Sequence, residues 1–305
     1  MAEFSAADAA FSGFRIVWER PVSLVYWSLL QFAVSIGVTL FITLTAGPAF
    51  THALEAMLQL NADPAQKLAV MEQVAPASIA VMLLSLVLFS VLSAAINRAV
   101  LRPEHWRFGY LRLAGDELRQ LGLFAMLLGM AFCAYVVLAV ALIAIFDLLS
   151  VVIGDAAIGL GAALLGLTLV GLVFAGVRLS LASPRTFDTG RIDLMEAWRM
   201  TRGRFWPLLG AYLLALGLSL VVQALTLAIA IFAAAIVGGG FGALGAGAQA
   251  DFSSIAAALA PVALVNLAVS SIGQALSFPI TAAPPAAIYK VLSGAGARGV
   301  GKTFV

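Results

Sequence analysis

Six long apolar segments without one charged residue most limit what this chain can fold into. Their residue ranges are 22–46, 77–96, 121–146, 156–177, 208–237 and 255–278, and none contains Asp, Glu, Lys, Arg or His. A helix needs about 20 such residues to cross a hydrocarbon core of about 30 Å. The segments do not alternate polar and apolar residues as barrel strands do. We therefore expect an all-α polytopic membrane protein with six transmembrane helices.

The composition leaves no room for a separate water-soluble domain. Of the 305 residues, 63% are hydrophobic and 10% are charged, whereas a soluble surface needs roughly a quarter charged residues. The sequence therefore predicts a single membrane-embedded domain over residues 1–305.

Basic residues are distributed very unevenly between the connections. Sixteen of the 17 Lys and Arg residues lie on one predicted side, and Lys67 alone lies on the other. Nine of the 15 acidic residues share the basic side, which gives it a net charge of +7 against −5 for the opposite side. Since positive residues are enriched in cytoplasmic loops, we predict that both termini are cytoplasmic.

A short basic stretch with bulky apolar residues precedes each odd-numbered span. These stretches cover residues 11–18, 110–119 and 192–206, and we expect each to form a short cytoplasmic helix at the membrane interface. In the third stretch Leu194, Trp198, Thr201 and Phe205 share one helical face, which is predicted to lie against the acyl chains.

Several local patterns refine this outline. Residues 47–76 contain two short apolar-periodic pieces, which predict a helical hairpin on the outer leaflet. Prolines at 261, 279, 284 and 285 predict a kinked sixth span followed by a separate helix over 286–292. Small residues spaced four apart, Ala162 with Gly166 and Gly171 with Ala175, predict close helix packing at the fourth span.

Arginines end the second and fourth spans, and acid–arginine pairs three residues apart begin the third and fifth. If the entry helices fold back over the ends of the spans, each acid can bond both its helical neighbour and the span-ending arginine. This arrangement predicts a cytoplasmic ion-pair or headgroup cluster of Arg98, Asp116, Arg119, Arg178, Glu196 and Arg199.

No motif in the sequence supports a metal, a cofactor or a catalytic group. The two histidines, His52 and His105, are predicted on opposite sides of the membrane. Residues 296–303 match the phosphate-binding-loop pattern, but no buried strand precedes them as that site requires. We therefore predict no catalytic residues and no cofactor, and no signal points to nucleic acid.

One cytoplasmic stretch resembles a known family. Arg178, Pro184, residues 196–199 (EAWR) and residues 203–206 (GRFW) are similar to the pattern of a bacterial six-helix membrane domain. That domain is attached to some glycerophosphodiester phosphodiesterases and also occurs as stand-alone inner-membrane proteins of unknown function. Residues 287–290 (AIYK) resemble its closing segment. The resemblance implies a bacterial inner-membrane protein, and it implies no hydrolase activity because the phosphodiesterase domain has no counterpart here.

Three classes of function stay open at this point. The first is a non-catalytic protein that presents its basic cytoplasmic face to anionic lipid or a protein partner. The second is a transporter for a neutral or lipid-like substrate, which would need a mid-membrane cavity reached by Gln223, Asn266 or Gln274. The third is a membrane enzyme of phosphoglycerol metabolism, which would need a metal held by acids from the following set: Asp116, Glu117, Asp188, Asp193 and Glu196.

Overall fold

The fold was analysed in a computed structural model that describes residues 5–58, 64–104, 106–153, 156–240 and 252–294. Every regular element in these ranges is helical. Six helices are long and apolar enough to cross a membrane, which confirms the predicted class of fold. In chain order the elements are α1 (Ala6–Ala10), α2 (Ser12–Glu19), α3 (Pro21–Leu58), α4 (Pro64–Leu101), η1 (Arg107–Tyr110), α5 (Gly115–Ile153), α6 (Ala156–Leu179), α7 (Ala182–Thr189), α8 (Leu194–Met200), α9 (Phe205–Val237), α11 (Ile255–Ala258) and α12 (Pro261–Leu292).

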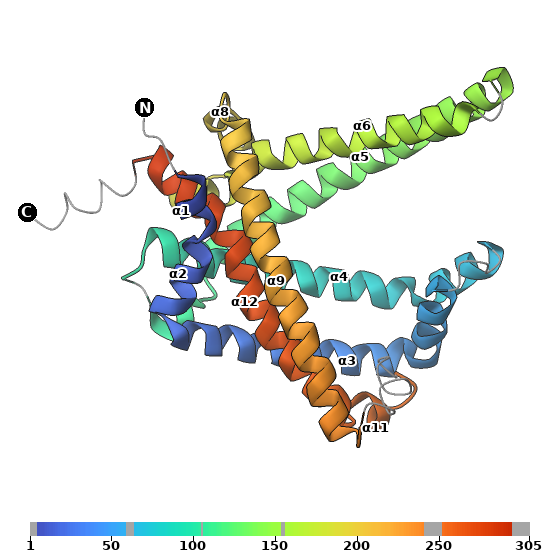
Figure 1. The fold of residues 1–305 in the computed structure, drawn as a ribbon, viewed down its shortest axis with the longest axis horizontal. Helices are drawn as coiled ribbons and strands as arrows, with labels where there is room; N and C mark the ends of the chain where they lie inside the picture. The colour runs from blue at the N-terminus through green and yellow to red at the C-terminus, as the bar shows by residue number, and fades with distance from the viewer. Residues whose placement is uncertain (1–4, 59–63, 105, 154–155, 241–251, 295–305) are drawn as a thin grey trace, which may run out of the picture.

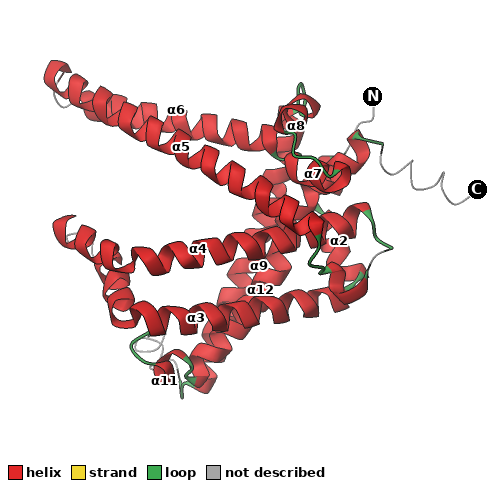
Figure 2. Cartoon of the chain, turned by 180° about the vertical axis from the view of Figure 1, so that it is seen from behind, coloured by secondary structure: helices red, strands yellow, loops and turns green. Residues whose placement is uncertain are grey.

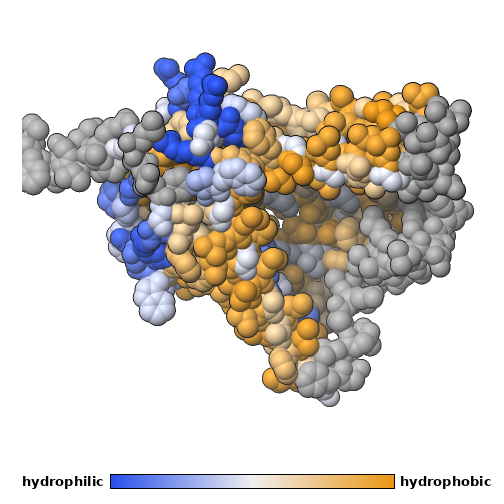
Figure 3. All heavy atoms as spheres, turned by 45° about the horizontal axis from the view of Figure 1, so that its top comes forward, coloured by the Kyte–Doolittle hydropathy of each residue, from blue (hydrophilic) through white to orange (hydrophobic). Residues whose placement is uncertain are grey.

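The long helices form three hairpins, α3 with α4, α5 with α6, and α9 with α12. They diverge from one end of the molecule, where α1, α2, α7 and α8 gather (Figure 1; Figure 2). Hydrophilic residues are concentrated at this end, and hydrophobic residues cover much of the long helices in view (Figure 3). We call it the polar end. The described parts of the connections predicted to be cytoplasmic lie there.

Helix α12 is the centre of the packing, because it contacts α9, α3, α2 and α4. Its backbone approaches two neighbours closely at glycines. A Cβ atom added to Gly13 of α2 would lie 2.4 Å from the carbonyl oxygen of Pro279, and one added to Gly273 would lie 2.3 Å from Cγ2 of Thr226 in α9. Glycine is therefore the residue that lets α2 and α9 pack directly on α12.

The α5/α6 hairpin is packed far less tightly. None of the residues in the most apolar stretch of α5 is buried. Gly166 and Gly171 of α6 have no atom within 4 Å of an added Cβ. The predicted close packing at these small residues is therefore wrong. Close approaches occur instead at Gly13 and Gly273, where α2 and α9 contact α12, and at Gly47 of α3, where an added Cβ would lie 2.4 Å from the carbonyl oxygen of Phe252.

Two predicted breaks in the helices are also absent. Residues 47–58 and 64–76 continue α3 and α4 through Pro48 and Pro76, and both helices turn in their distal parts (Figure 1). The connection between the two predicted pieces, residues 59–63, lies outside the described residues. Helix α12 begins at Pro261, where a first-turn proline costs no hydrogen bond, and runs unbroken to Leu292 through three prolines. Transmembrane helices tolerate such prolines when neighbouring helices cover them.

Short helices form in two of the three places where interfacial helices were predicted. α2 and α8 are short helices ahead of α3 and α9. Residues 110–119 do not form one, because the chain makes the tight turn η1 and an extended link before α5 begins at Gly115. The aromatic face of α8 packs on α6 rather than facing outward: the ring centroids of Trp198 and Phe174 are 5.9 Å apart.

Candidate functional site at the polar end

A buried ion pair joins the end of α4 to the start of α5. Nη2 of Arg98 lies 2.7 Å from Oε1 of Glu117, and each side chain is only 5% exposed. The other carboxylate oxygen of Glu117 accepts the backbone N–H of Ala114 at 2.9 Å. This is the backbone-directed half of a capping box at the first turn of α5. Glu117 thus neutralises a buried guanidinium and caps a helix at once.

Asp116 lies at the edge of this pair. Its carboxylate is 3.6 Å from Arg98 and 3.0 Å from Arg119, which is 48% exposed. The predicted contact between Arg98 and Asp116 is therefore present, but the shorter and more buried contact is the one to Glu117. The sequence pattern did not single out Glu117 for this role, since it is adjacent to Asp116 and either acid could have faced Arg98.

Arg178 at the end of α6 has a different environment from the one predicted. Its guanidinium lies over the rings of Trp198 and Phe174, 4.9 and 5.6 Å from their centroids, and 3.5 Å from the hydroxyl of Thr201. It forms no ion pair with Glu196, so the predicted Arg178–Glu196 pair is wrong. Trp198 and Thr201 face α6, and this orientation of α8 turns Glu196 elsewhere.

Glu196 instead lies beside its helical neighbour. The distance from its carboxylate to Arg199 is 3.6 Å, and the two side chains are 39% and 72% exposed. An exposed pair of this kind contributes about 0 to 1 kcal/mol. The six predicted residues therefore lie at the same end of the molecule in separate environments, with Arg98 and Asp116 in one network and Arg178 apart from Glu196.

Further polar side chains tie α7 into this end, and the sequence pattern did not single out Asn97, Gln120 or Ser183 among them. The amide of Gln120 donates to the carbonyl of Ser183 at 2.8 Å, and Asn97 donates to the Ser183 hydroxyl at 2.9 Å. Asp193 caps α8 by accepting the N–H of Glu196 and pairs with Arg185 at 3.1 Å. That backbone hydrogen bond, together with the nearby Arg185 charge, lowers the pKa of the Asp193 carboxyl.

Two arginines lie beside a hollow, Arg107 in η1 and Arg112 in the link that follows it. Arg98, Arg107, Phe108, Tyr110, Leu111 and Arg112 line a cavity of about 470 Å³. Arg107 and Arg112 are exposed, and neither forms an ion pair within the described part of the chain. Because Glu117 neutralises Arg98, these two residues supply the uncompensated positive charge of this cavity.

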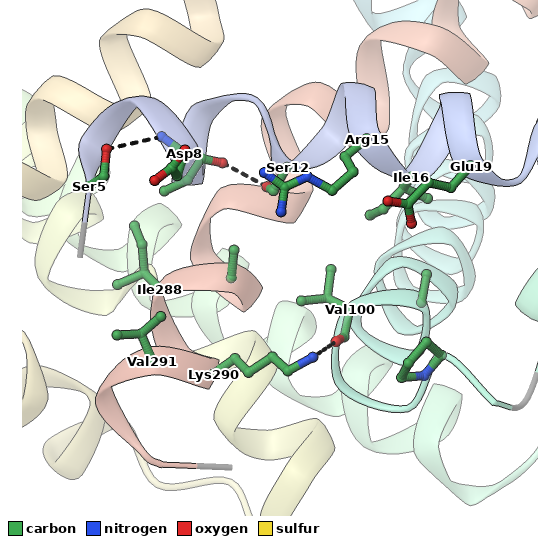
Figure 4. A pocket seen from close by; sticks show the side chains of 14 residues that line it. Ser5, Asp8, Ser12, Arg15, Ile16, Glu19, Val100, Ile288, Lys290 and Val291 are labelled. Atoms are coloured by element: carbon green, nitrogen blue, oxygen red, sulfur yellow. Dashed lines mark hydrogen bonds between the residues drawn. The ribbon is translucent and has the colours of Figure 1, made fainter. Parts of the chain in front are cut away.

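A second cavity, of about 490 Å³, lies under the N-terminal helices. Asp8, Arg15 and Glu19 reach it from α1 and α2, and Lys290 reaches it from α12 (Figure 4). The Lys290 ammonium donates to the carbonyl of Val100 at 2.9 Å. A cation at the last turn of α4 also suits the negative end of the helix dipole. With two charges of each sign around it, this cavity has no net preference for anions.

The residues that line the cavities, and the contacts of the acidic side chains, bear on the transport and enzyme hypotheses. The cavities beside α2, η1, α5 and α3 are lined by residues other than Gln223, Asn266 and Gln274. Within the described ranges, no group of three or more His, Cys, Asp or Glu side chains could hold a metal ion. The acids named for the enzyme hypothesis are instead engaged by other groups: Asp116 and Glu117 contact Arg98, and Asp188 accepts the Tyr289 hydroxyl at 2.9 Å.

Comparison with known proteins adds no relative. No protein-family model matches the chain, and neither does any curated protein or solved structure.

Proposed function

We propose that this chain is a non-catalytic protein of the bacterial inner membrane that binds anionic phospholipid headgroups at its polar end. The observation that carries the proposal is a set of exposed arginines at that end that form no ion pair with an acid among the described residues: Arg15, Arg107, Arg112, Arg191 and Arg202. Each such charge near an anionic leaflet contributes about 1 kcal/mol of attraction.

Exposed aromatic side chains lie among these arginines. Trp18, Trp106 and Trp206 are 89%, 56% and 77% exposed. Tryptophan favours the headgroup level of a membrane, because its ring is apolar and its N–H can still find a polar partner. The combination of aromatic rings and unpaired guanidinium groups suits a surface that rests on phosphate-bearing lipid.

Lipid binding tests the proposal directly. We expect the detergent-solubilised protein to retain phosphatidylglycerol in preference to phosphatidylcholine when native mass spectrometry counts bound lipids. Raising the salt from 0.1 to 1 M shortens the Debye length from about 10 to about 3 Å, so the preference should fall steeply. Equal retention of both lipids with no effect of salt would contradict the proposal.

The cytoplasmic orientation of the polar end belongs to the same proposal and has its own test. In a Cys133→Ala background, we expect Ser254→Cys to react with a membrane-impermeant thiol reagent added outside intact cells. Thr189→Cys should react only after the membrane is opened. Both positions are exposed in the fold, so access to the reagent depends on the side of the membrane. The reverse labelling pattern would overturn the orientation.

A further inference from the structure

The turn at residues 107–112 has a backbone conformation that its sequence does not favour. Phe108, Gly109 and Tyr110 have φ angles of 51°, 63° and 65°. This is the left-handed region, which a glycine adopts freely but aromatic residues rarely do. Strain of this kind persists only where the surroundings impose it, and it is concentrated at functional sites.

Two buried side chains impose the conformation. The indole N–H of Trp27 in α3 donates to the carbonyl of Gly109 at 2.8 Å, and Arg98 donates to the carbonyl of Tyr110. Tyr110 itself is buried, whereas Phe108 is 64% exposed. The turn therefore anchors one aromatic residue in the core and holds the other outside it.

Two arginines near Phe108 give the exposed side of the turn its positive charge. Arg107 and Arg112 both line the 470 Å³ cavity with Phe108. The neighbouring cation, Arg98, is neutralised by Glu117 at 2.7 Å. A ligand at this cavity thus meets two free guanidinium groups, which bind phosphate oxygens well, and an apolar ring.

An apolar groove continues from the same loop. Val87, Val91, Leu113, Leu118 and Leu121 line most of a hollow of about 270 Å³ between α4 and α5. Leu111 and Arg112 border the basic cavity, and Leu113 and Ala114 border the groove. A phosphate group and a hydrocarbon chain on one molecule would match these two environments, which are bordered by consecutive residues of the chain.

We propose that the 107–112 turn is a specific site for one anionic phospholipid, with its phosphate between Arg107 and Arg112 and an acyl chain in the α4/α5 groove. This inference rests on the proposed function and deepens it, because it selects one place on the polar end. The strained turn positions Phe108 at the level where the headgroup meets the acyl chain.

Paired arginine substitutions test the location. Phosphatidylglycerol is titrated into the delipidated protein in detergent, and native mass spectrometry measures the first binding step. We expect Arg107→Ala/Arg112→Ala to weaken that step about thirtyfold, as two charge contacts would. The matched control, Arg191→Ala/Arg202→Ala, removes two other exposed arginines that do not line the cavity and should weaken it less than threefold.

The possible results separate the two proposals. Equal losses in both pairs would overturn the specific site and leave a diffuse basic surface, as the proposed function states. No loss in either pair would overturn both proposals. Inorganic phosphate that competes with the lipid at comparable concentration would overturn the lipid assignment in favour of a simple anion site.

The strained residue supplies an independent readout. Phe108→Gly removes an unfavourable left-handed side chain, so we expect the melting temperature in detergent to rise. The same change removes the apolar contact, so the first phosphatidylglycerol should bind several-fold more weakly. A purely structural Phe108 would show unchanged lipid binding, and that result would overturn its role in the site.

Discussion

Replacing Glu117 with alanine should destabilise the protein by about 3 to 5 kcal/mol, the cost of removing one partner from a buried ion pair. The change leaves the Arg98 guanidinium buried without its closest countercharge, 2.7 Å away in the native fold. It also removes the cap on the N–H of Ala114. The free energy of unfolding, measured by denaturant titration in micelles, should show the loss.

Glu196→Ala is the matched control, because it removes the same side chain from an exposed pair with Arg199. We expect a change of about 0 to 1 kcal/mol there. The double variant Arg98→Met/Glu117→Leu should lose less than the sum of its two single variants, since the residues contact each other. Additive losses would show that Arg98 and Glu117 act independently.

Replacing Gly13 with alanine, which adds a single methyl group, should be the second strongly destabilising change. The added Cβ of Gly13→Ala would lie 2.4 to 2.6 Å from backbone atoms of Pro279 and Ile280. Backbone atoms of a long helix cannot rotate away as a side chain can, so α2 must move off α12. We expect a loss of about 1 to 3 kcal/mol from overpacking and faster proteolysis of the N-terminal segment.

Gly37→Ala is the control for this experiment. Gly37 lies within α3 and has no atom within 4 Å of an added Cβ, so alanine should be neutral or slightly stabilising through its higher helix propensity. Melting temperatures in detergent compare the two variants. Equal melting temperatures for Gly13→Ala and Gly37→Ala would show that α2 does not pack on α12 as described.

The glycines show which features of helix packing the sequence alone did not predict. Spacing alone suggested that Gly166 and Gly171 mark close helix contacts, but tight approaches occur at other glycines, among them Gly13 and Gly273. A small residue permits a close approach without requiring one. Which glycine is used depends on which helices cross, and only the arrangement around α12 decides that.

For the charged residues, too, some contacts were predicted from the sequence and others were not. The sequence correctly indicated that Arg98 and Asp116 would meet, because they end and begin consecutive spans. It missed Glu117, which makes the shorter and more buried contact. For Arg178 it predicted an acidic partner, and the fold supplies Trp198 and Phe174 instead. The rotation of α8 about its own axis decides between these outcomes, and seven residues do not encode it.

The sequence by itself determined the class of protein and the number of its long helices. In lipid each spanning segment must satisfy its own backbone hydrogen bonds, so a local run of apolar residues is enough to predict a helix. Only the tertiary structure decided the left-handed turn at 108–110 and the cavity beside it. That turn depends on Trp27, which is 82 positions from Gly109 in the chain, and on the buried guanidinium of Arg98. Contacts between such distant segments arise from packing, and no local pattern of residues specifies them.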